Sequence, residues 1–179
     1  MTRESSAIMD FLLRWLLPTK ATPCKVPSEG AVFQLTLDAD RIDPFGMALV
    51  DNVETLGLKF EGKRLKGRIT KSFQLLCFGD VKNTDDAEMR ASAQGKKLAR
   101  GEWREAFLSK FPYPDGPDCP YHIAFGSVEA KWVSEKYGNI FPILYHGFRR
   151  HRGEDREWIP NFSCATDIRS YTLWLVEDK

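Results

Sequence analysis

Residues 62–81, GKRLKGRITKSFQLLCFGDV, constrain the fold most, because they join a run of positive charge to the longest strand candidate in the chain. Successive side chains of a strand point to opposite faces of its sheet. Phe73, Leu75 and Cys77 therefore share one face, and Leu76 and Phe78 share the other. Apolar side chains on both faces predict a central strand that is buried on both sides.

The first half of this stretch is basic and meets no acidic residue before Asp80. Because unpaired charges of one sign resist burial, we expect a cationic loop at the surface. Such a loop is a candidate contact for an anionic membrane surface or a nucleoprotein, and the alternative is an ordinary solvated turn. The basic residues are Lys63, Arg64, Lys66, Arg68 and Lys71.

Alternating apolar and polar residues predict further strands in both halves of the chain. We expect the strand that contains Pro142 to lie at an edge of the sheet or to begin there, because proline has no N–H to donate to a neighbouring strand. The predicted strands cover residues 31–38, 56–61, 123–132, 140–148 and 171–176.

The segment between the two groups of strands predicts two short helices. Asn83 or Thr84 can cap the first helix. The second helix has an apolar face, formed by Trp103, Phe107, Leu108 and Phe111. The expected fold class is α+β, with an antiparallel sheet from both halves of the chain and a helical insertion packed on it.

Residues 1–30 predict a separate N-terminal amphipathic helix and a proline-rich linker, followed by a single α+β domain over 31–179. The apolar stripe of this helix can pack on its own domain, on a partner chain in self-association, or in a lipid interface. The stripe has helical spacing and includes Phe11, Leu12, Trp15 and Leu16.

The overall charge is nearly balanced, at 26 basic and 25 acidic residues, so any binding to an anionic partner must be local. A second basic cluster follows the strand at 140–148 and contains Arg149, Arg150 and Arg152. The sequence has no apolar run of the roughly 20 residues that a membrane-spanning helix needs. Its four widely spaced cysteines predict reduced thiols in a cytoplasmic location. The basic clusters and the apolar N-terminal helix predict peripheral attachment to a membrane.

None of the common catalytic motifs is present: there is no glycine-rich phosphate loop, no GxSxG and no HExxH. The three histidines lack the spacing of metal ligands, and no carboxylate pair is marked out for acid–base chemistry. We therefore predict no catalytic residues, no metal and no cofactor, although an enzymatic activity is unsupported rather than excluded.

The order of elements resembles the matrix proteins of rhabdoviruses over residues 31–162. The resemblance is carried by AVFQLTL, the RIDPF turn, the apolar-basic loop FEGKRLKGR, the buried strand FQLLCF, a later AFL and a final EW-I. It implies a non-enzymatic, self-associating structural protein that lies on the inner face of a viral envelope and binds the nucleocapsid or its RNA. A virion location would follow.

This chain also departs from the rhabdovirus pattern. It lacks the lysine-rich N-terminal arm and the PPxY motif of that family. Membrane attachment through residues 63–68 and the N-terminal helix is therefore a hypothesis specific to this chain.

Two alternatives come from other classes of protein. The segment LLCFGDVKNTDDAEMRA, followed by WREAFLSKFP, resembles flavin-binding split-barrel oxidoreductases, but the upstream arginine and serine pattern that binds the flavin phosphate is missing. A small cytosolic adaptor or regulatory domain is the second alternative. It predicts a monomer that binds neither lipid nor RNA.

Overall fold

The computed structural model describes residues 25–41, 58–112, 114, 122–148, 156–164 and 168–178. Within these ranges the α-helices are α3 (Thr84–Ala93) and α4 (Trp103–Lys110), and a 3-10 turn, η1, covers Ala39–Arg41. The strands are β1 (Phe33–Asp38), β2 (Leu58–Gly62), β3 (Arg68–Cys77), β4 (Lys97–Leu98), β5 (His122–Ala124), β6 (Ala130–Ser134), β7 (Gly138–Phe148), β8 (Arg156–Cys164) and β9 (Leu173–Asp178).

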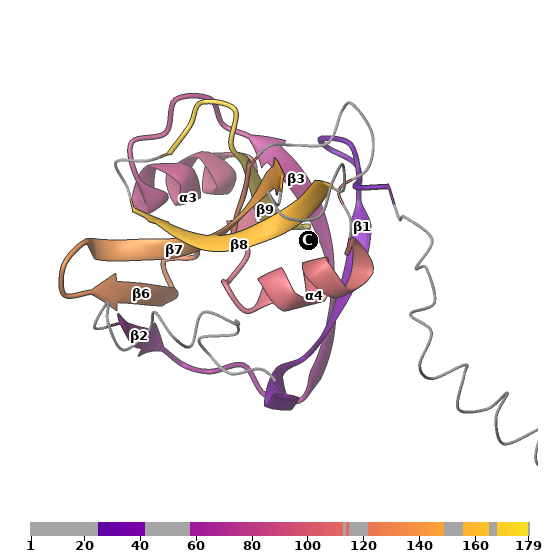
Figure 1. Ribbon diagram of the computed structural model, residues 1–179, viewed down its shortest axis with the longest axis horizontal. Helices are drawn as coiled ribbons and strands as arrows, with labels where there is room; N and C mark the ends of the chain where they lie inside the picture. Colours follow the sequence, from indigo (N-terminus) through magenta and orange to yellow (C-terminus); the bar gives the residue numbers. More distant parts are fainter. Residues whose placement is uncertain are drawn as a thin grey trace, which may run out of the picture.

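All of these strands join one curled sheet (Figure 1) in the order β1-β3-β9-β5-β7-β6-β2, with β4 added beside β9 and β8 added beside β7. Both halves of the chain contribute, since β3 pairs with β9 and β2 pairs with β6. The α+β class is therefore confirmed. The sheet is not wholly antiparallel, however, because β5 runs parallel to β9.

The central strand predicted from residues 73–78 is confirmed by β3, which lies between β1 and β9. Phe73 and Leu75 belong to the apolar cluster around α4, whereas Leu76 and Phe78 belong to a second cluster around α3. Cys77 is the exception, because it is partly exposed and its Sγ donates to the carbonyl oxygen of Ser170 at 3.2 Å.

The two helices cover opposite faces of the sheet. In β9, Leu175 packs in the cluster around α4, while its neighbours Trp174 and Val176 pack in the cluster around α3. Because side chains alternate along a strand, α3 and α4 must lie on different faces. In Figure 1, α3 is seen above the ribbons of β7 and β8, and α4 below them.

Helix α4 forms the centre of the larger cluster, as its predicted apolar face requires. Phe107 is fully buried, and its ring lies 4.9 Å from Phe111 and 5.9 Å from Phe125 between ring centroids. The indole Nε1 of Trp158 donates to the carbonyl oxygen of Phe111 at 2.9 Å, which joins the end of α4 to β8. On the other face, Asn83 caps α3 by accepting from the backbone N–H of Asp86.

The prediction that Pro142 lies at a sheet edge is wrong. Strand β7 has β8 on one side and both β5 and β6 on the other. The carbonyl oxygen of Pro142 accepts from the N–H of Phe125 at 2.9 Å, in the gap between β5 and β6. Since the N and C=O of one residue point to the same side of a strand, the missing N–H of Pro142 faces Phe125, beyond the end of β5, and not β8. The same gap divides the single strand predicted over 123–132 into β5 and β6.

The predicted N-terminal helix, with Phe11, Leu12, Trp15 and Leu16, lies outside the described residues.

Candidate functional site

The basic loop of residues 62–68 joins β2 to β3 and is fixed at both ends. Gly62 has a φ of 141°, and a Cβ added to it would lie 2.5 Å from the carbonyl oxygen of Glu129. At the other end, Gly67 donates its backbone N–H to the Oδ1 of Asp40 at 3.0 Å. Between them, Arg100 donates from its Nη2 to the carbonyl oxygen of Lys63 at 2.5 Å. The loop backbone is therefore held at three points.

Four of the five contact residues predicted between Lys63 and Lys71 are exposed and have no acidic partner among the described residues. Lys63, Arg64, Lys66 and Arg68 are all exposed, and none forms an ion pair within the described part of the chain. Leu65, the apolar residue among them, packs against the core instead. The loop thus presents four cations to the solvent on a fixed backbone, and we call these four residues the basic loop cluster.

Lys71, the fifth predicted contact residue, differs from the cluster. Its Nζ lies 2.6 Å from the Oε2 of Glu177, so its charge is partly neutralised by β9. Elsewhere on the described surface the pattern of Lys71 is common. Carboxylates pair with Lys59, Lys96, Lys97 and Lys131.

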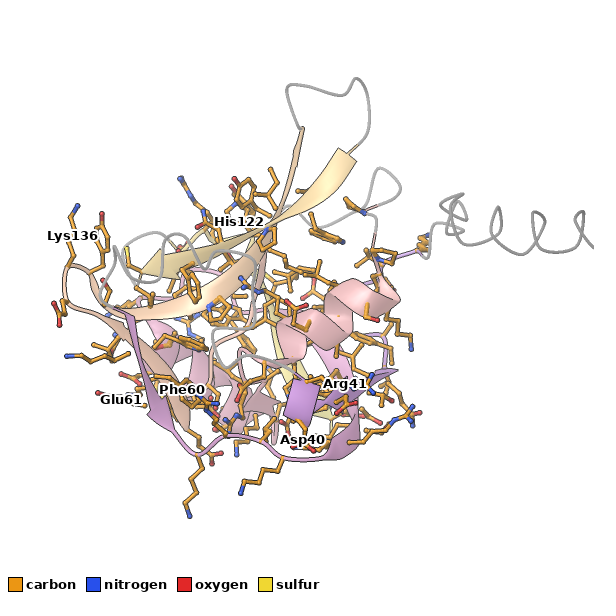
Figure 2. All side chains as sticks on the ribbon, turned by 60° about the horizontal axis from the view of Figure 1, so that its bottom comes forward. Asp40, Arg41, Phe60, Glu61, His122 and Lys136 are labelled. Carbon is orange, nitrogen blue, oxygen red and sulfur yellow. The ribbon has the colours of Figure 1, made fainter. Side chains whose placement is uncertain are left out.

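Two acidic side chains border the basic loop cluster. Asp40 holds the backbone of the loop, and Glu61 is exposed at the end of β2. A third acidic residue, Asp38, is already paired with Arg41 at 3.2 Å. Four cations therefore outnumber two bordering carboxylates, and the local charge is positive. Figure 2 shows nitrogen-tipped side chains pointing away from the protein between the labelled Glu61 and Asp40.

Further cations, outside the basic loop cluster, act on a carboxylate beside the start of the loop. Glu129, which lies beside the start of the loop, has a lowered pKa. The largest cause is the hydrogen bond from Lys97, and the charges of Arg100 and Lys71 lower the pKa further. The carboxylate of Glu129 is thus stabilised by several cations at once, as expected beside a basic surface.

A buried arginine, which sequence reasoning missed, forms a second site inside the fold. Arg104 has no exposed surface. Its Nη1 donates to the carbonyl oxygens of Asn161 at 2.9 Å and Ile143 at 3.4 Å, and the ring of Phe162 lies 5.4 Å from its Cζ. Its Nε and Nη2 have no hydrogen-bond partner. An unsatisfied buried polar group costs about 1–3 kcal/mol, so this arrangement needs an explanation.

Burial lowers the pKa of Arg104 to about 9, and the neighbouring Glu105 opposes this shift. The side chain therefore remains protonated at neutral pH. Among the described residues no carboxylate comes within ion-pair distance of it. The sequence did carry a signal of its burial: Arg104 stands three, four and seven residues before Phe107, Leu108 and Phe111, so helical spacing places it on the predicted apolar face. Its charge is what kept it out of the predicted core.

The second predicted basic cluster, with Arg149, Arg150 and Arg152, lies outside the described residues. Among the helices that are described, none has the length and apolar character needed to cross a membrane. The same part of the chain contains no group of three or more histidine, cysteine or acidic side chains that could hold a metal. The resemblances to rhabdovirus matrix proteins and to flavin-binding split barrels remain predictions. Comparison of the chain with protein-family models, with curated proteins and with solved structures finds no match.

Proposed function

We propose that this protein is a non-enzymatic docking protein that binds an anionic membrane surface through the basic loop cluster. The observation that carries the proposal is the exposure of Lys63, Arg64, Lys66 and Arg68 without an acidic partner in the described structure. Exposed cations gain most from an anionic surface when they are not already neutralised by the protein itself. In this respect the cluster differs from Lys71, which is paired with Glu177.

The energetics require more than this loop. A cation close to an anionic membrane contributes about 1 kcal/mol, and the two bordering carboxylates offset part of the total. One loop therefore binds weakly and reversibly. The apolar helix predicted over the first 17 residues would supply a second, hydrophobic contact. Self-association would multiply the number of contacts per particle, because linked weak sites bind with increased avidity.

A matrix-like role combines these elements. In this proposal the basic loop cluster faces the membrane, the chains associate with one another, and the second basic cluster at 149–152 contacts a nucleoprotein. The proposal is supported by the geometry of the loop, and by the sequence patterns of the N-terminal helix and of the second basic cluster.

RNA is the other anionic partner to consider for the loop. Proteins that hold single-stranded RNA usually combine a basic groove with aromatic side chains on which bases stack. The loop GKRLKGR contains no aromatic residue, and the nearby Phe60 packs against Trp132 with ring centroids 5.0 Å apart. These features favour a lipid surface over an RNA.

The test is co-flotation of the full-length protein with vesicles of phosphatidylcholine alone and with vesicles that also contain phosphatidylserine. A parallel arm measures binding to a fluorescent single-stranded RNA at the same ionic strength. We expect binding to the anionic vesicles that decreases as salt is added, because exposed charges are screened. Equal flotation with both kinds of vesicle, or binding to RNA alone, would contradict the membrane proposal.

A further inference from the structure

The buried guanidinium of Arg104 is not used by the surface that we propose for membrane docking. It lies between α4 and the β7–β8 pair, on the same face of the helix as Phe107. The neighbouring Glu105 acts on its charge, but no carboxylate of the described residues forms an ion pair with it. Buried charges in proteins are normally paired or bound to a ligand. A buried guanidinium whose donors have no partner in the protein is therefore a candidate site for an anionic ligand.

The atoms left without partners form one geometric unit. Nη1 is fixed by the carbonyl oxygens of Ile143 and Asn161. The two remaining nitrogens, Nε and Nη2, have no hydrogen-bond partner. The N–H bonds of these two nitrogens point in the same direction in the plane of the guanidinium. Together they make the fork that receives both oxygens of one carboxylate or phosphate.

We infer that the Nε–Nη2 edge of Arg104 is a binding site for an organic monocarboxylate. A single guanidinium in a dry environment balances a single negative charge, which matches a carboxylate. A phosphate dianion would bring a second charge that no described neighbour neutralises. The face of the guanidinium is covered by Phe162, so an anion must approach in the plane of the group, where the fork is.

The apolar side chains near the guanidinium indicate the chemical character of the ligand beyond its carboxylate. The ring of Phe162 lies 5.7 Å from Trp132, which lies 5.0 Å from Phe60, and these residues form a separate apolar cluster with Ile140 and Cys164. Because Arg104 is fully buried beside this cluster, a carboxylate that reaches the fork is expected to carry an apolar or aromatic body. Among the described strands, β8 pairs with β7 alone. Its residue Asn161 is exposed, and Phe162 is half-buried. Since Arg104 is fully buried and bonded to the carbonyl oxygen of Asn161, entry of an anion would require β8 to move away from α4.

The experiment uses the full-length chain with octanoate and benzoate as probes. Methyl octanoate is the matched control, because it keeps the apolar body and lacks the charge, and inorganic phosphate tests the choice of anion. Binding is measured by isothermal titration calorimetry and by the ¹H–¹⁵N signal of Arg104 Nε. We expect one carboxylate per chain and a shift of that signal, and neither effect with methyl octanoate.

Two substitutions locate the site. Arg104→Met keeps an unbranched apolar chain and removes the fork, and is expected to abolish binding. Arg104→Lys keeps the positive charge without the planar fork, and is expected to bind roughly tenfold more weakly or worse. Circular dichroism checks that both variants are folded, and the Nε signal of the wild-type chain provides the test without any variant.

Several results would overturn the inference. Unchanged carboxylate binding in Arg104→Met would place the ligand elsewhere, and equal binding of methyl octanoate would remove the role of charge. Preference for phosphate would contradict the ligand class. An Arg104 Nε signal that no millimolar carboxylate shifts would show that the fork is closed, for example by an acidic side chain of the chain itself.

Discussion

The two glycines that delimit the basic loop should respond very differently to the same substitution. Gly62→Ala places a Cβ 2.5 Å from the backbone oxygen of Glu129, at a φ of 141°. Gly67→Ala also has a positive φ, 72°, but its Cβ meets no atom within 4 Å. Both variants add one methyl group to the same loop. The difference in their stability therefore reports the close approach of Gly62 to Glu129, together with the difference in φ.

The expected free energies follow from these geometries. A non-glycine residue in the left-handed region costs about 1–2 kcal/mol, which is the whole expected loss for Gly67→Ala. At Gly62 the φ lies in a region that costs about 1–3 kcal/mol for other residues. The clash with a backbone atom adds about 1–3 kcal/mol, because the strand must move and cannot rotate a side chain away. We therefore expect Gly62→Ala to lower the free energy of unfolding by about 2–6 kcal/mol.

Urea denaturation followed by circular dichroism measures both variants on the same scale. The reasoning predicts that Gly62→Ala unfolds at a clearly lower urea concentration than Gly67→Ala, with the slope of the transition unchanged. If the two variants lost the same stability, Gly62 would not lie against Glu129, and the account of a loop fixed at that end would be refuted.

Two further predictions concern the core and the dependence on pH. Phe107→Ala should lower the free energy of unfolding by about 3–5 kcal/mol in the same urea assay, because it empties the centre of the cluster around α4. Tyr137→Ala, at an exposed position, should change it by less than about 0.5 kcal/mol, and similar losses in both would contradict the described core. Burial raises the pKa of Glu88, so the folded state favours its protonated form, and the stability that this confers is lost as the pH rises through the folded-state pKa. Glu88→Gln should therefore stabilise the protein progressively more, relative to wild type, as the pH rises from about 4 to about 8, and a thermal melting series with no such trend would contradict a buried carboxyl.

Local patterns in the sequence predicted the parts of the fold that depend on neighbouring residues. The alternation from Phe73 to Phe78 predicted a strand covered on both faces, and Asn83 was among the predicted helix caps. The pairing of β2 with β6 and the parallel contact of β5 with β9 were not predictable in this way, since they join segments that are distant in the chain. Pro142 misled for a related reason, because the gap that accommodates it is formed by two other strands.

The same limit applies to the candidate sites. The positive charges of the loop are visible in the sequence, but their partners are not. Lys71 resembles its neighbours in sequence, yet its acidic partner is 106 positions away. Arg104 follows the helical spacing of Phe107, Leu108 and Phe111, so the pattern indicated the face on which it lies. The pattern did not indicate that a charged side chain on this face is buried, because that depends on the strands that cover the helix.

The most direct test of the central claim compares two charge variants in binding to phosphatidylserine vesicles. The loop variant carries glutamine in place of Lys63, Arg64, Lys66 and Arg68. The control variant removes the same number of charges from exposed lysines outside the loop by placing glutamine at Lys25, Lys59, Lys82 and Lys136.

At about 1 kcal/mol for each cation, the loop variant should bind about one to three orders of magnitude more weakly than the wild type, while the control variant keeps most of its affinity. Equal losses in the two variants would show that total charge alone governs binding. Unchanged binding by the loop variant would show that the basic loop cluster does not hold the membrane.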